Sequence, residues 1–524
     1  MTTSQWHTHD LKVIAERIAE KIEKGEIKNK QDLLRYKKFF SKEYGLDRIP
    51  SDTELLASID EESRESILGI LQRKPVRTIS GVAVVAVMSS PHPCPHGRCV
   101  PCPGGPPYSP QSYTGMEPAA RRAERNNFDP YLQVRDRIKQ LEIIGHPTDK
   151  IDMIIMGGTF PARDLHYQEW FVKRCYDALN EKNARNLEEA KRINEGAKHR
   201  CIGLTVETRP DWCRLIHVEK MLEMGATRVE IGAQILDDEI LYIMKRGHTV
   251  SDTIMATQIA RDAGLKICYH IMPGLPGSNY ERDMESFKRM FTDERFRPDM
   301  LKIYPTLVVK PSALYEMWKQ GRYRPLDEKE AVELIAEMKE YVPEWVRIQR
   351  IERDIPSNLI EAGIKKSNLR QVVQEKMRKE GKKCRCIRCR EVGHLGMEVG
   401  DDFILRRREY VANGGREIFL SFESRDAIAA YCRLRIPYHP HFFDDDCAIV
   451  RELKVHGPMV EIGKRKEERW QHRGYGKMLM DEAEKQARRF GKSRLLVLSG
   501  VGVRSYYRKM GYEKQGFYMA KVLD

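Results

Sequence analysis

Two groups of three cysteines lie close together in this chain of 524 residues. The first group is Cys94, Cys99 and Cys102, in a proline- and glycine-rich loop with the spacing C-x4-C-x2-C. Three thiolates at such short spacing can each bind one iron of a [4Fe–4S] cluster. The fourth iron then stays open, which a cluster needs if it is to bind and reduce a small molecule.

A structural zinc site is the alternative for this loop. It would need a fourth ligand, for which His92 or His96 is available. The place of the loop favours the cluster, because the loop follows the first strand of a repeated strand–helix pattern. In parallel barrels the chemistry gathers in the loops at the carboxyl ends of the strands.

The second group, Cys384, Cys386 and Cys389, has the spacing C-x-C-x2-C. Three thiolates leave a closed tetrahedral metal site one ligand short; His394 is near in sequence, and a distant residue or water serves equally well. A second iron–sulfur cluster is the alternative. Paired disulfides are disfavoured, since MTTSQWHTHD lacks a secretory signal pattern. The other six cysteines are expected to be small buried residues: Cys175, Cys201, Cys213, Cys268, Cys432 and Cys447.

A glycine-rich loop near the C-terminus can bind an anion. Gln471, Gly474 and Gly476 lie where a polar loop leads into an amphipathic helix, and backbone amides gathered at a helix N-terminus bind phosphate. A strand at 451–457 precedes the loop, and the segment 497–513 follows the helix. This order resembles the GNAT acetyltransferase fold, in which the loop holds the pyrophosphate of coenzyme A.

The elements that must position these groups alternate between strand and helix. From about residue 76 the pattern predicts a parallel α/β sheet, either a barrel or a partial barrel. Strands are expected at Ile79–Met88, Ile151–Met156, Cys201–Glu207, Arg228–Gln234, Lys266–Met272 and Leu301–Thr306, with helices at Pro118–Ile144, Glu169–Leu179, Val218–Met224 and Thr253–Ala263. In the C-terminal part, strands are expected at Asp402–Tyr410, Glu417–Glu423, Ala448–His456 and Arg494–Ser499, with a helix at Gly474–Phe490.

The N-terminal part is expected to be helical, because Leu11, Ile14, Ile18 and Ile22 recur at the helix period. These patterns together divide the chain into four parts. We predict a helical extension at 1–75, a barrel domain at 76–359, a basic connector at 360–397 and a smaller α/β domain at 398–524.

The charge of the chain favours a polyanionic partner. Lys and Arg number 91 against 77 Asp and Glu, a formal charge of +14, and residues 365–390 hold eleven basic side chains against Glu375 and Glu380. A smaller basic cluster lies between Lys28 and Lys42, where a solvated helix face is an equal alternative. The longest apolar stretch, Gly81–Met88, is far too short to span a bilayer, so a cytoplasmic protein without membrane contact is expected.

The first cysteine loop resembles that of the radical S-adenosylmethionine (SAM) superfamily, whose commoner spacing is one residue shorter. Gly157 and Gly158 end the second expected strand, where the superfamily commonly has Gly-Gly-Glu and binds the amino group of SAM. Thr159 replaces that acid here, so the contact would rest on backbone groups. Glu207 and Gln234 end the next two strands, where a cofactor contact and an ordinary barrel-rim residue are both open.

The pairing of a radical-SAM-like barrel with a GNAT-like domain resembles the catalytic subunits of Elongator, in their prokaryotic single-protein form. The resemblance covers nearly the whole chain and includes QSYTGMEPAA (111–120), VETRPDWC (206–213), KRGHTV (245–250), LKIYPTLVV (301–309), RIERDIP (350–356), EYVANGG (409–415) and SGVGVRSYY (499–507). It implies modification of the wobble uridine of tRNA. In that family a SAM-derived radical removes hydrogen from the methyl group of acetyl-CoA. The carbon radical adds to C5 of the uridine, and thioester hydrolysis leaves 5-carboxymethyluridine.

The resemblance also assigns residues. Lys150, Tyr506 and Tyr507 would be catalytic, and Lys150 would reach acetyl-CoA from the barrel side. Acetyl-CoA contacts would fall on Lys150, Glu452, Leu453, Lys454, Val455, Gln471, Gly474, Tyr475, Gly476, Lys477 and Tyr507. The first cysteine group would hold the [4Fe–4S] cluster, Gly157 and Gly158 would contact SAM, and Cys384, Cys386 and Cys389 would hold zinc. The anticodon stem-loop of tRNA, a reductant protein and a second copy of the chain are the partners that the resemblance suggests.

Two other functions compete with this one. A protein lysine acetyltransferase of the histone type would use the C-terminal domain alone, but it would have no use for a cysteine group after the first barrel strand. A non-catalytic tRNA-binding module would have a degenerate barrel, yet Cys94, Cys99 and Cys102 are all present. Both features favour the modifying enzyme.

Overall fold

The computed structural model describes residues 4–50, 52–60, 67–68, 70, 81–397, 399–400, 402–456 and 474–524. The chain forms two compact units. The first comprises Met1–Ala83 and Arg135–Lys150, and the second comprises Val84–Val134 and Ile151–Asp524. Within the described residues, no helix combines the length and the apolar character that crossing a bilayer requires.

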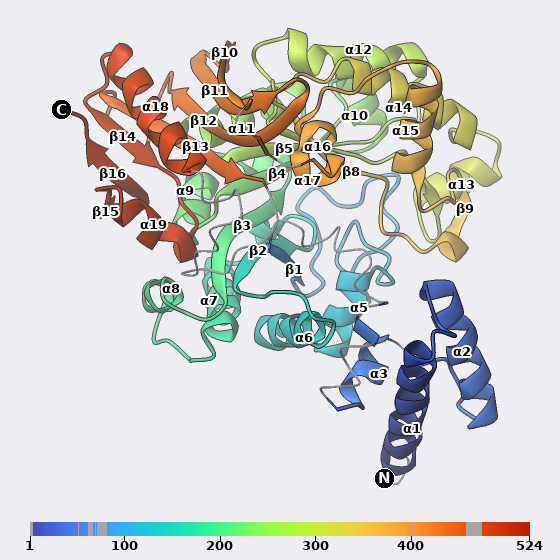
Figure 1. Ribbon diagram of the computed structural model, residues 1–524. Coiled ribbons are helices and arrows are strands. Elements are labelled where there is room, and N and C mark those ends of the chain that lie inside the picture. The colour runs from blue at the N-terminus through green and yellow to red at the C-terminus, as the bar shows by residue number, and fades with distance from the viewer. Residues whose placement is uncertain are drawn as a thin grey trace. The chain divides into compact units, whose positions relative to one another are not determined.

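The first unit is helical, as its periodicity predicts. Its helices are α1 (Ser4–Glu23), α2 (Lys30–Glu43) and α3 (Asp52–Ala57) (Figure 1). Ile14, Ile18 and Phe40 are buried in its core. Lys37, within the basic cluster, is also buried, with its Nζ 2.8 Å from Asp52 Oδ1, so this cation is neutralised inside the unit.

The second unit contains a sheet of seven strands in the order β1-β2-β3-β4-β5-β6-β8, and its pairs from β3 to β8 are parallel. The strands are β1 (Ala83–Met88), β2 (Lys150–Met156), β3 (Arg200–Thr208), β4 (Arg228–Gln234), β5 (Lys266–Ile271), β6 (Met300–Ile303) and β8 (Arg347–Ile351). The helices are α5 (Pro118–Arg125), α7 (Leu165–Asn180), α8 (Leu187–Asn194), α9 (Leu215–Glu223), α10 (Asp238–Ile243), α11 (Val250–Asp262), α12 (Tyr280–Thr292), α13 (Ala313–Lys319) and α14 (Glu328–Glu340). Helix α6 (Pro130–Ile143) begins in the second unit and from Arg135 on belongs to the first. The partial α/β barrel is confirmed, with β8 as a seventh strand.

The expected single helix at Pro118–Ile144 is wrong, because the chain forms α5 and α6 there. Asn127 and Phe128 adopt left-handed conformations, with φ of 50° and 56°. Left-handed residues end helices, and Pro130, which begins α6, cannot continue a preceding one.

The segment between the two sheets contains β7 (Val308–Val309), which pairs with β9 (Ile360–Ala362), and three helices. The helices are α15 (Leu369–Lys379), α16 (Ile387–Arg390) and α17 (Val392–Leu395). Hydrophobic side chains of α15 are buried, among them Val373 and Met377, so the basic connector is a folded part of the second unit.

A second sheet follows, in the order β10-β11-β12-β13-β14-β16-β15. Its strands are β10 (Ile404–Ala412), β11 (Gly415–Ser424), β12 (Ala427–Ile436), β13 (Cys447–Val455), β14 (Arg494–Val497), β15 (Glu513–Gln515) and β16 (Tyr518–Val522), with helices α18 (Tyr475–Arg489) and α19 (Arg504–Arg508). The sequence pattern did not predict β12, because its alanines are poor strand formers and its arginines are charged residues in a buried strand. Arg433 and Arg435 of β12 are nevertheless buried, since acidic partners neutralise them.

The two sheets of the second unit are joined by buried ion pairs and by close backbone contact. Arg451 of β13 binds Asp299, which precedes β6, at 2.6 Å and Glu417 of β11 at 2.7 Å. A Cβ at Gly500 would lie 2.0 Å from the carbonyl oxygen of Ile202 in β3. Glycine is therefore required there, because any larger residue would push the second sheet off the barrel.

Candidate functional site

Each sulfur of the first cysteine group has a polar neighbour. The Cys94 Sγ lies 3.6 Å from Thr159 Oγ1. Arg246 Nη1 donates to Cys99 Sγ at 3.3 Å, and the backbone N–H of Ser112 donates to Cys102 Sγ at 3.2 Å. Such donors stabilise thiolates, the form that binds metal. Burial acts in the opposite direction and raises the pKa of Cys94.

The separation of these sulfurs fits a cluster better than a single ion. Four thiolates around one zinc at about 2.3 Å would lie about 3.8 Å apart. Among the described residues, the three-ligand groups whose atoms all lie within 4.8 Å of one another do not include this triplet. His96 does approach, with Nε2 3.0 Å from Cys99 Sγ. Because each thiolate of a cluster binds a different iron, wider spacing is what a [4Fe–4S] group requires.

Gly157 and Gly158 bring the end of β2 against this loop. Both have positive φ, 128° and 82°. A Cβ at Gly157 would lie 2.1 Å from Ser89 Oγ, and one at Gly158 would lie 3.6 Å from Cys94 Sγ. These glycines let the backbone approach the cysteine loop closely, which suits the predicted contact with SAM.

Polar side chains continue from the cysteine loop into the barrel. Tyr113, next to Ser112, donates its hydroxyl to Glu207 Oε2 at 2.7 Å. Lys302 Nζ lies 3.8 Å from Glu207 Oε1 and pairs with Glu230. The sequence pattern identified Glu207 but missed Lys302 and Glu230, because charged residues inside strands have no spacing signal.

At its other end, the polar series reaches the second sheet. Arg228 Nε lies 3.5 Å from Glu230 Oε1, and its guanidinium lies 3.3 Å from Asp152. Glu452 of β13 interacts electrostatically with Arg228. Burial raises the pKa of the Glu452 carboxyl, but the positive charges of Arg433, Lys266 and Lys454 outweigh it and lower the pKa to about 2.

Glu452, Leu453, Lys454 and Val455 lie where β13 separates from β14. The parallel pairing of these strands covers only Cys447–Val450. Pairing of β13 with β12 continues to Val455, with Arg451 as an extra residue between the Leu434–Val450 and Arg433–Glu452 pairs. This bulge bends β13 away from β14. Along 451–455, backbone groups on the β14 side are thus open to an extended ligand such as the pantetheine arm of coenzyme A.

The start of α18 adds the second part of the predicted acetyl-CoA site. Gly474 caps the helix with φ of 77°, and Tyr475 is buried against Phe422, with ring centroids 4.4 Å apart. Lys477 is exposed and lies 2.7 Å from Asp481. Gln471, the remaining predicted contact in this loop, lies outside the described residues.

Tyr506 and Tyr507 lie on α19. Their ring centroids are 5.3 Å apart, and a Cβ at Gly476 would lie 2.5 Å from the Tyr506 hydroxyl oxygen. Tyr506 is therefore brought to the first turn of α18. Tyr507 is buried, and burial raises the pKa of its phenol. Burial also raises the pKa of the Tyr506 phenol, so both phenols are held in the protonated form.

Lys150, the other predicted catalytic residue, is the first residue of β2 and the last residue of the first compact unit. Burial lowers the pKa of its ammonium group. A depressed pKa at a lysine is a property of groups that act in proton transfer. Its role toward acetyl-CoA stays a prediction.

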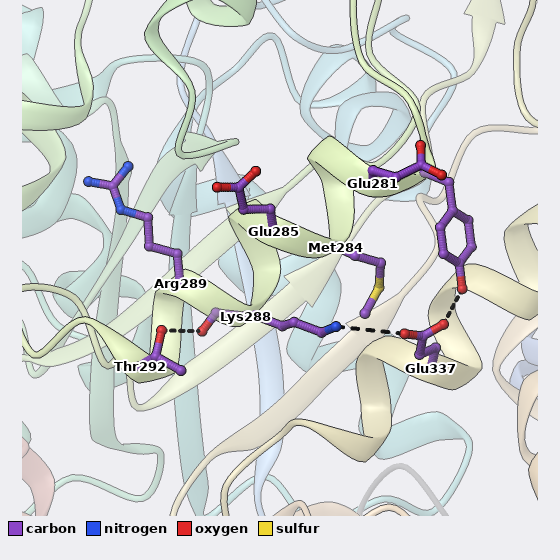
Figure 2. Close-up of a pocket in the computed structure, with 8 residues that line it drawn as sticks. Glu281, Met284, Glu285, Lys288, Arg289, Thr292 and Glu337 are labelled. Atoms are coloured by element: carbon purple, nitrogen blue, oxygen red, sulfur yellow. Dashed lines mark hydrogen bonds and ion pairs between the residues drawn. The ribbon is translucent and has the colours of Figure 1, made fainter.

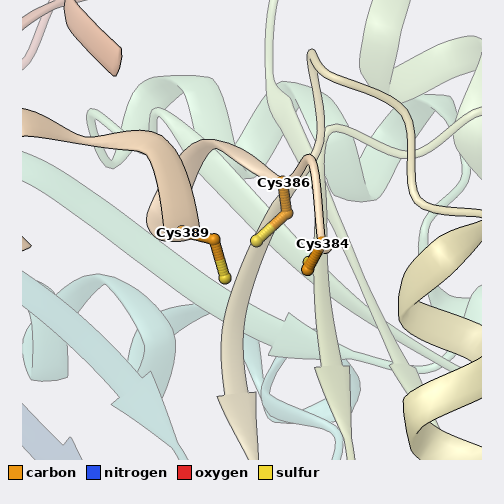
Figure 3. Close-up of side chains that lie close together, drawn as sticks. All are labelled: Cys384, Cys386 and Cys389. Atoms are coloured by element: carbon orange, nitrogen blue, oxygen red, sulfur yellow. The ribbon is translucent and has the colours of Figure 1, made fainter. Parts of the chain in front are cut away.

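The second cysteine group is compact. The sulfurs of Cys384, Cys386 and Cys389 lie within 4.8 Å of one another, and Figure 3 shows them converging from one loop and the start of α16. Hydrogen bonds from the Cys384 and Cys389 thiols lower the pKa of Cys386. His394 is engaged elsewhere, with Nε2 2.9 Å from Glu391 Oε1. The three sulfurs fit a single zinc ion and leave its fourth position to another ligand.

The basic side chains near this group have acidic partners. Lys382 Nζ lies 3.0 Å from Glu340, Lys383 Nζ lies 3.6 Å from Asp426, and Arg385 pairs with Glu344. Lys383 and Arg385 remain 82% and 63% exposed, so both cations can still reach solvent or a bound polyanion. Their contribution to binding is reduced by the carboxylates beside them.

A surface pocket on α12 and α14 lies apart from these groups (Figure 2). Its lining includes Lys288 and Glu337, whose Nζ and Oε1 are 3.9 Å apart, and Tyr280, which donates to Glu337. None of the predicted site residues lines it.

Known families match consecutive parts of the chain. Residues 11–79 match the ELP3 N-terminal domain, 91–290 the radical SAM superfamily, 298–379 the radical SAM C-terminal domain and 394–512 the GNAT acetyltransferase family. The chain is similar to the tRNA uridine(34) acetyltransferase of Methanocaldococcus infernus, with 55% identity over 489 residues, 90% of this chain and 92% of the relative. It is also similar to Elongator complex protein 3 of Drosophila melanogaster, with 43% identity over 98% of this chain and 96% of that protein.

A solved structure agrees with these relationships. The archaeal Elp3 of Methanocaldococcus infernus, lacking its N-terminus, superimposes with a TM-score of 0.76 and 51% identity. The match covers 85% of this chain and all of that one. The identities far exceed what shared folding alone requires, and they extend through both sheets. The chain belongs to the family of tRNA uridine(34) acetyltransferases and Elongator complex protein 3.

Proposed function

We propose that this protein is an enzyme that modifies the wobble uridine of tRNA, using SAM and acetyl-CoA to form 5-carboxymethyluridine. One observation carries the proposal. A cysteine loop fitted to a cluster lies at the carboxyl ends of the barrel strands, and the open edge of β13 lies beside the other ends of those strands. Between them lies a series of interacting polar side chains: Tyr113, Glu207, Lys302, Glu230, Arg228 and Glu452.

The residues of the barrel would hold the first reagent. Cys94, Cys99 and Cys102 would bind the cluster, with Arg246 and the Ser112 N–H offsetting the thiolate charge. When bound, the cluster and SAM supply one-electron chemistry, which can activate a methyl C–H bond that is far too weak an acid for an ordinary base near neutral pH.

The residues of the second sheet would hold acetyl-CoA. The open edge of β13 over Glu452–Val455 would bind the pantetheine arm, and the amides at the start of α18 would bind the pyrophosphate. The protonated phenol of Tyr506 lies beside Gly476, and the ring of Tyr507 lies 5.3 Å from that of Tyr506. The two phenols would donate hydrogen bonds to the thioester end or its carrier. Lys150 would contact acetyl-CoA from the barrel side, as the family resemblance implies.

Zinc at Cys384, Cys386 and Cys389 would be structural. The site includes Cys389 of α16, and this helix packs on β8 of the barrel and on β12 of the second sheet. A metal ion there would brace the connector between the two sheets. The exposed cations of this connector would bind the phosphates of the anticodon stem-loop, and α2 of the first unit would offer further cations to tRNA. A separate reductant protein and a second copy of the chain are further partners that we include in the proposal.

The proposal is tested by nucleoside mass spectrometry. Unmodified tRNA is incubated with the reduced, cluster-loaded protein, SAM and acetyl-CoA, and each small molecule is left out in turn. Formation of 5-carboxymethyluridine only in the complete mixture is the expected result. A protein lysine acetyltransferase would instead acetylate peptides without SAM and leave the tRNA unchanged.

A further inference from the structure

Lys266, the first residue of β5, is a lysine to which the reaction described above gives no role. Its side chain is partly buried, and within the described part of the chain it forms no hydrogen bond or ion pair. Alternate side chains of a strand share a face, so Lys266 lies on the same face as His270, which contacts Glu230 inside the barrel. Holding an amine inside a folded unit without a partner is unfavourable, so a function is the better explanation for it.

The chain just before β5 is docked where β13 and β14 separate. Arg451 Nη1 donates to the carbonyl oxygen of Leu265 at 2.9 Å. A Cβ at Gly264 would lie 2.4 Å from Ile449 Cδ1 and 3.3 Å from Leu498 Cβ. Ile449 is in the paired part of β13, and Leu498 directly follows β14. The start of β5 therefore lies at the closed end of the opening between these two strands.

The contact between α18 and β13 fixes the direction in which a pantetheine arm would run. A Cβ at Gly476 would lie 3.8 Å from Val455 Cγ2, so the amides proposed to bind the pyrophosphate lie beside Val455. From Val455 to Arg451 the strand extends about 13 Å, at about 3.3 Å per residue. The pantetheine arm is a chain of about twelve atoms, the length of about four extended residues. With the pyrophosphate at α18, the thioester would reach the bulge at Arg451, next to the start of β5.

The charges around Lys266 leave its proton available. Burial lowers the pKa of its ammonium group to about 8. The charged groups that interact with it are Asp152 of β2, Arg228 of β4, and Arg451 and Glu452 of β13. Both carboxylates have other partners, since Asp152 lies 3.3 Å from Arg228 and Glu452 lies 2.9 Å from Arg433. A pKa near the operating pH suits a group that gives and regains a proton.

We propose that Lys266 is the general acid of the thioester hydrolysis that completes the modification. This inference rests on the proposed function and names the group that releases coenzyme A. Attachment through the methyl carbon leaves the two-carbon unit as a thioester, which water must open. The oxygen of water bonds to the carbonyl carbon, the carbon–sulfur bond breaks, and the sulfur takes the proton of the Lys266 ammonium. Of the two protons that water gives up, one returns to the lysine and the other goes to solvent, which leaves a carboxylate and a thiol.

The first experiment locates the thioester without turnover. Full-length protein is incubated with acetyl-CoA alone at pH values below and above about 8, and acetylated peptides are mapped by mass spectrometry. Above this pH the neutral amine of Lys266 should attack the thioester carbonyl, release coenzyme A and become acetylated. Lys383, which is 82% exposed, is the control for non-specific acetylation, and Lys266 should be labelled at least about fivefold more. Labelling of Lys266 no greater than that of Lys383 would overturn the proposal.

The second experiment tests proton donation with two variants of the loaded enzyme. Lys266→Met should slow release of coenzyme A about a hundredfold, so that tRNA carrying the unit as its coenzyme A thioester accumulates. Formation of 5′-deoxyadenosine should change less than about twofold, because that step precedes hydrolysis. Lys266→Arg keeps a positive charge but gives up no proton near neutral pH, so it should behave like Lys266→Met. Full recovery in Lys266→Arg, or equal loss of 5′-deoxyadenosine and product in Lys266→Met, would mean that the charge is only structural and would overturn the proposal.

The dependence on pH gives a further readout. In wild-type protein thioester opening should slow as the pH rises through about 8, because the ammonium form of Lys266 is lost, and both variants should lack this decrease. A decrease that persists in both variants would contradict the assignment.

These results separate the inference from the proposed function. If wild-type protein and Lys266→Met form free 5-carboxymethyluridine at the same rate, the general acid is wrong and the function stands. If acetyl-Lys266 forms but the complete mixture yields neither the modified nucleoside nor its thioester, the proposed function is wrong and the place of Lys266 beside the thioester is supported.

Discussion

The two cysteine groups have similar spacings and different geometries. Cys384, Cys386 and Cys389 bring their sulfurs within 4.8 Å of one another, close enough for one ion. Cys94, Cys99 and Cys102 do not, and each of their sulfurs instead meets a separate polar neighbour. The cysteine triplet in a proline- and glycine-rich loop thus suits a larger cluster, and the triplet in the basic connector suits a single metal ion.

The difference arises from the surrounding elements. The compact group lies where a loop enters the short helix α16, whose turn brings Cys386 and Cys389 together. The wider group lies in a loop held by Arg246, which is remote in sequence, and by the backbone of Ser112, which follows the cysteines. Three closely spaced cysteines therefore predict a metal site, and the residues around the sulfurs determine whether a single ion or a larger cluster fits.

The largest effect is expected from Cys99→Ser. Loss of one cluster ligand should abolish formation of 5-carboxymethyluridine and the visible absorption of the reconstituted cluster, while bound zinc is retained. Affinity for tRNA should change less than about twofold, because it depends on phosphate contacts. Activity assays, absorption spectra and binding titrations check this. Loss of tRNA binding together with activity would mean that the loop is structural.

Exposure to air should separate the two groups without mutation. An iron–sulfur cluster with an open iron is sensitive to oxygen, whereas zinc has no redox chemistry. Iron and product formation should be lost together, while zinc per chain stays unchanged by elemental analysis. Parallel loss of both metals would show that the two groups hold the same kind of site.

Cys386→Ser is the matched counterpart of Cys99→Ser. Cys386 is fully buried, so this change should remove zinc and lower the thermal stability of the second unit. Each kcal/mol lost would lower the melting temperature by less than the roughly 2–4 °C expected for a domain of 150–250 residues, because the second unit is larger. Calorimetry and metal analysis check this. Unchanged melting with zinc absent would mean that the ion does not brace the connector.

The smallest effect is expected from removing charge beside the compact group. The triple change of Lys382, Lys383 and Arg385 to Gln should weaken binding to all tRNAs alike and flatten its salt dependence. Because acidic partners already neutralise part of this charge, the slope should fall by less than about three. An unchanged slope would show that this surface does not face tRNA.

Much of the fold could be predicted from the sequence. The six expected barrel strands were placed within a few residues, because buried parallel strands are continuous β-branched runs. The strand β12 was missed, since Arg433 and Arg435 become buried only through partners remote in sequence, such as Asp299 and Asp262. Helix α6 was merged with α5, because the left-handed residues between them carry no hydrophobic signal.

The candidate site was predictable only where residue type carries the chemistry. The cysteines and the glycines before α18 can be identified from the sequence. Arg246, Lys302 and Glu230 could not be, because nothing in their local sequence distinguishes them from surface charges. The positions of Lys302 and Glu230 follow from strand register, which places side chains remote in sequence next to one another. Arg246 reaches Cys99 from the segment between α10 and α11.

Isotope transfer tests the central claim, that both sheets contribute reagents to one product. The loaded enzyme would be given acetyl-CoA with three deuterium atoms on the methyl group, together with unlabelled SAM and tRNA. We expect 5-carboxymethyluridine with two deuterium atoms and 5′-deoxyadenosine with one. Unlabelled 5′-deoxyadenosine, or a modified nucleoside without deuterium, would contradict the account.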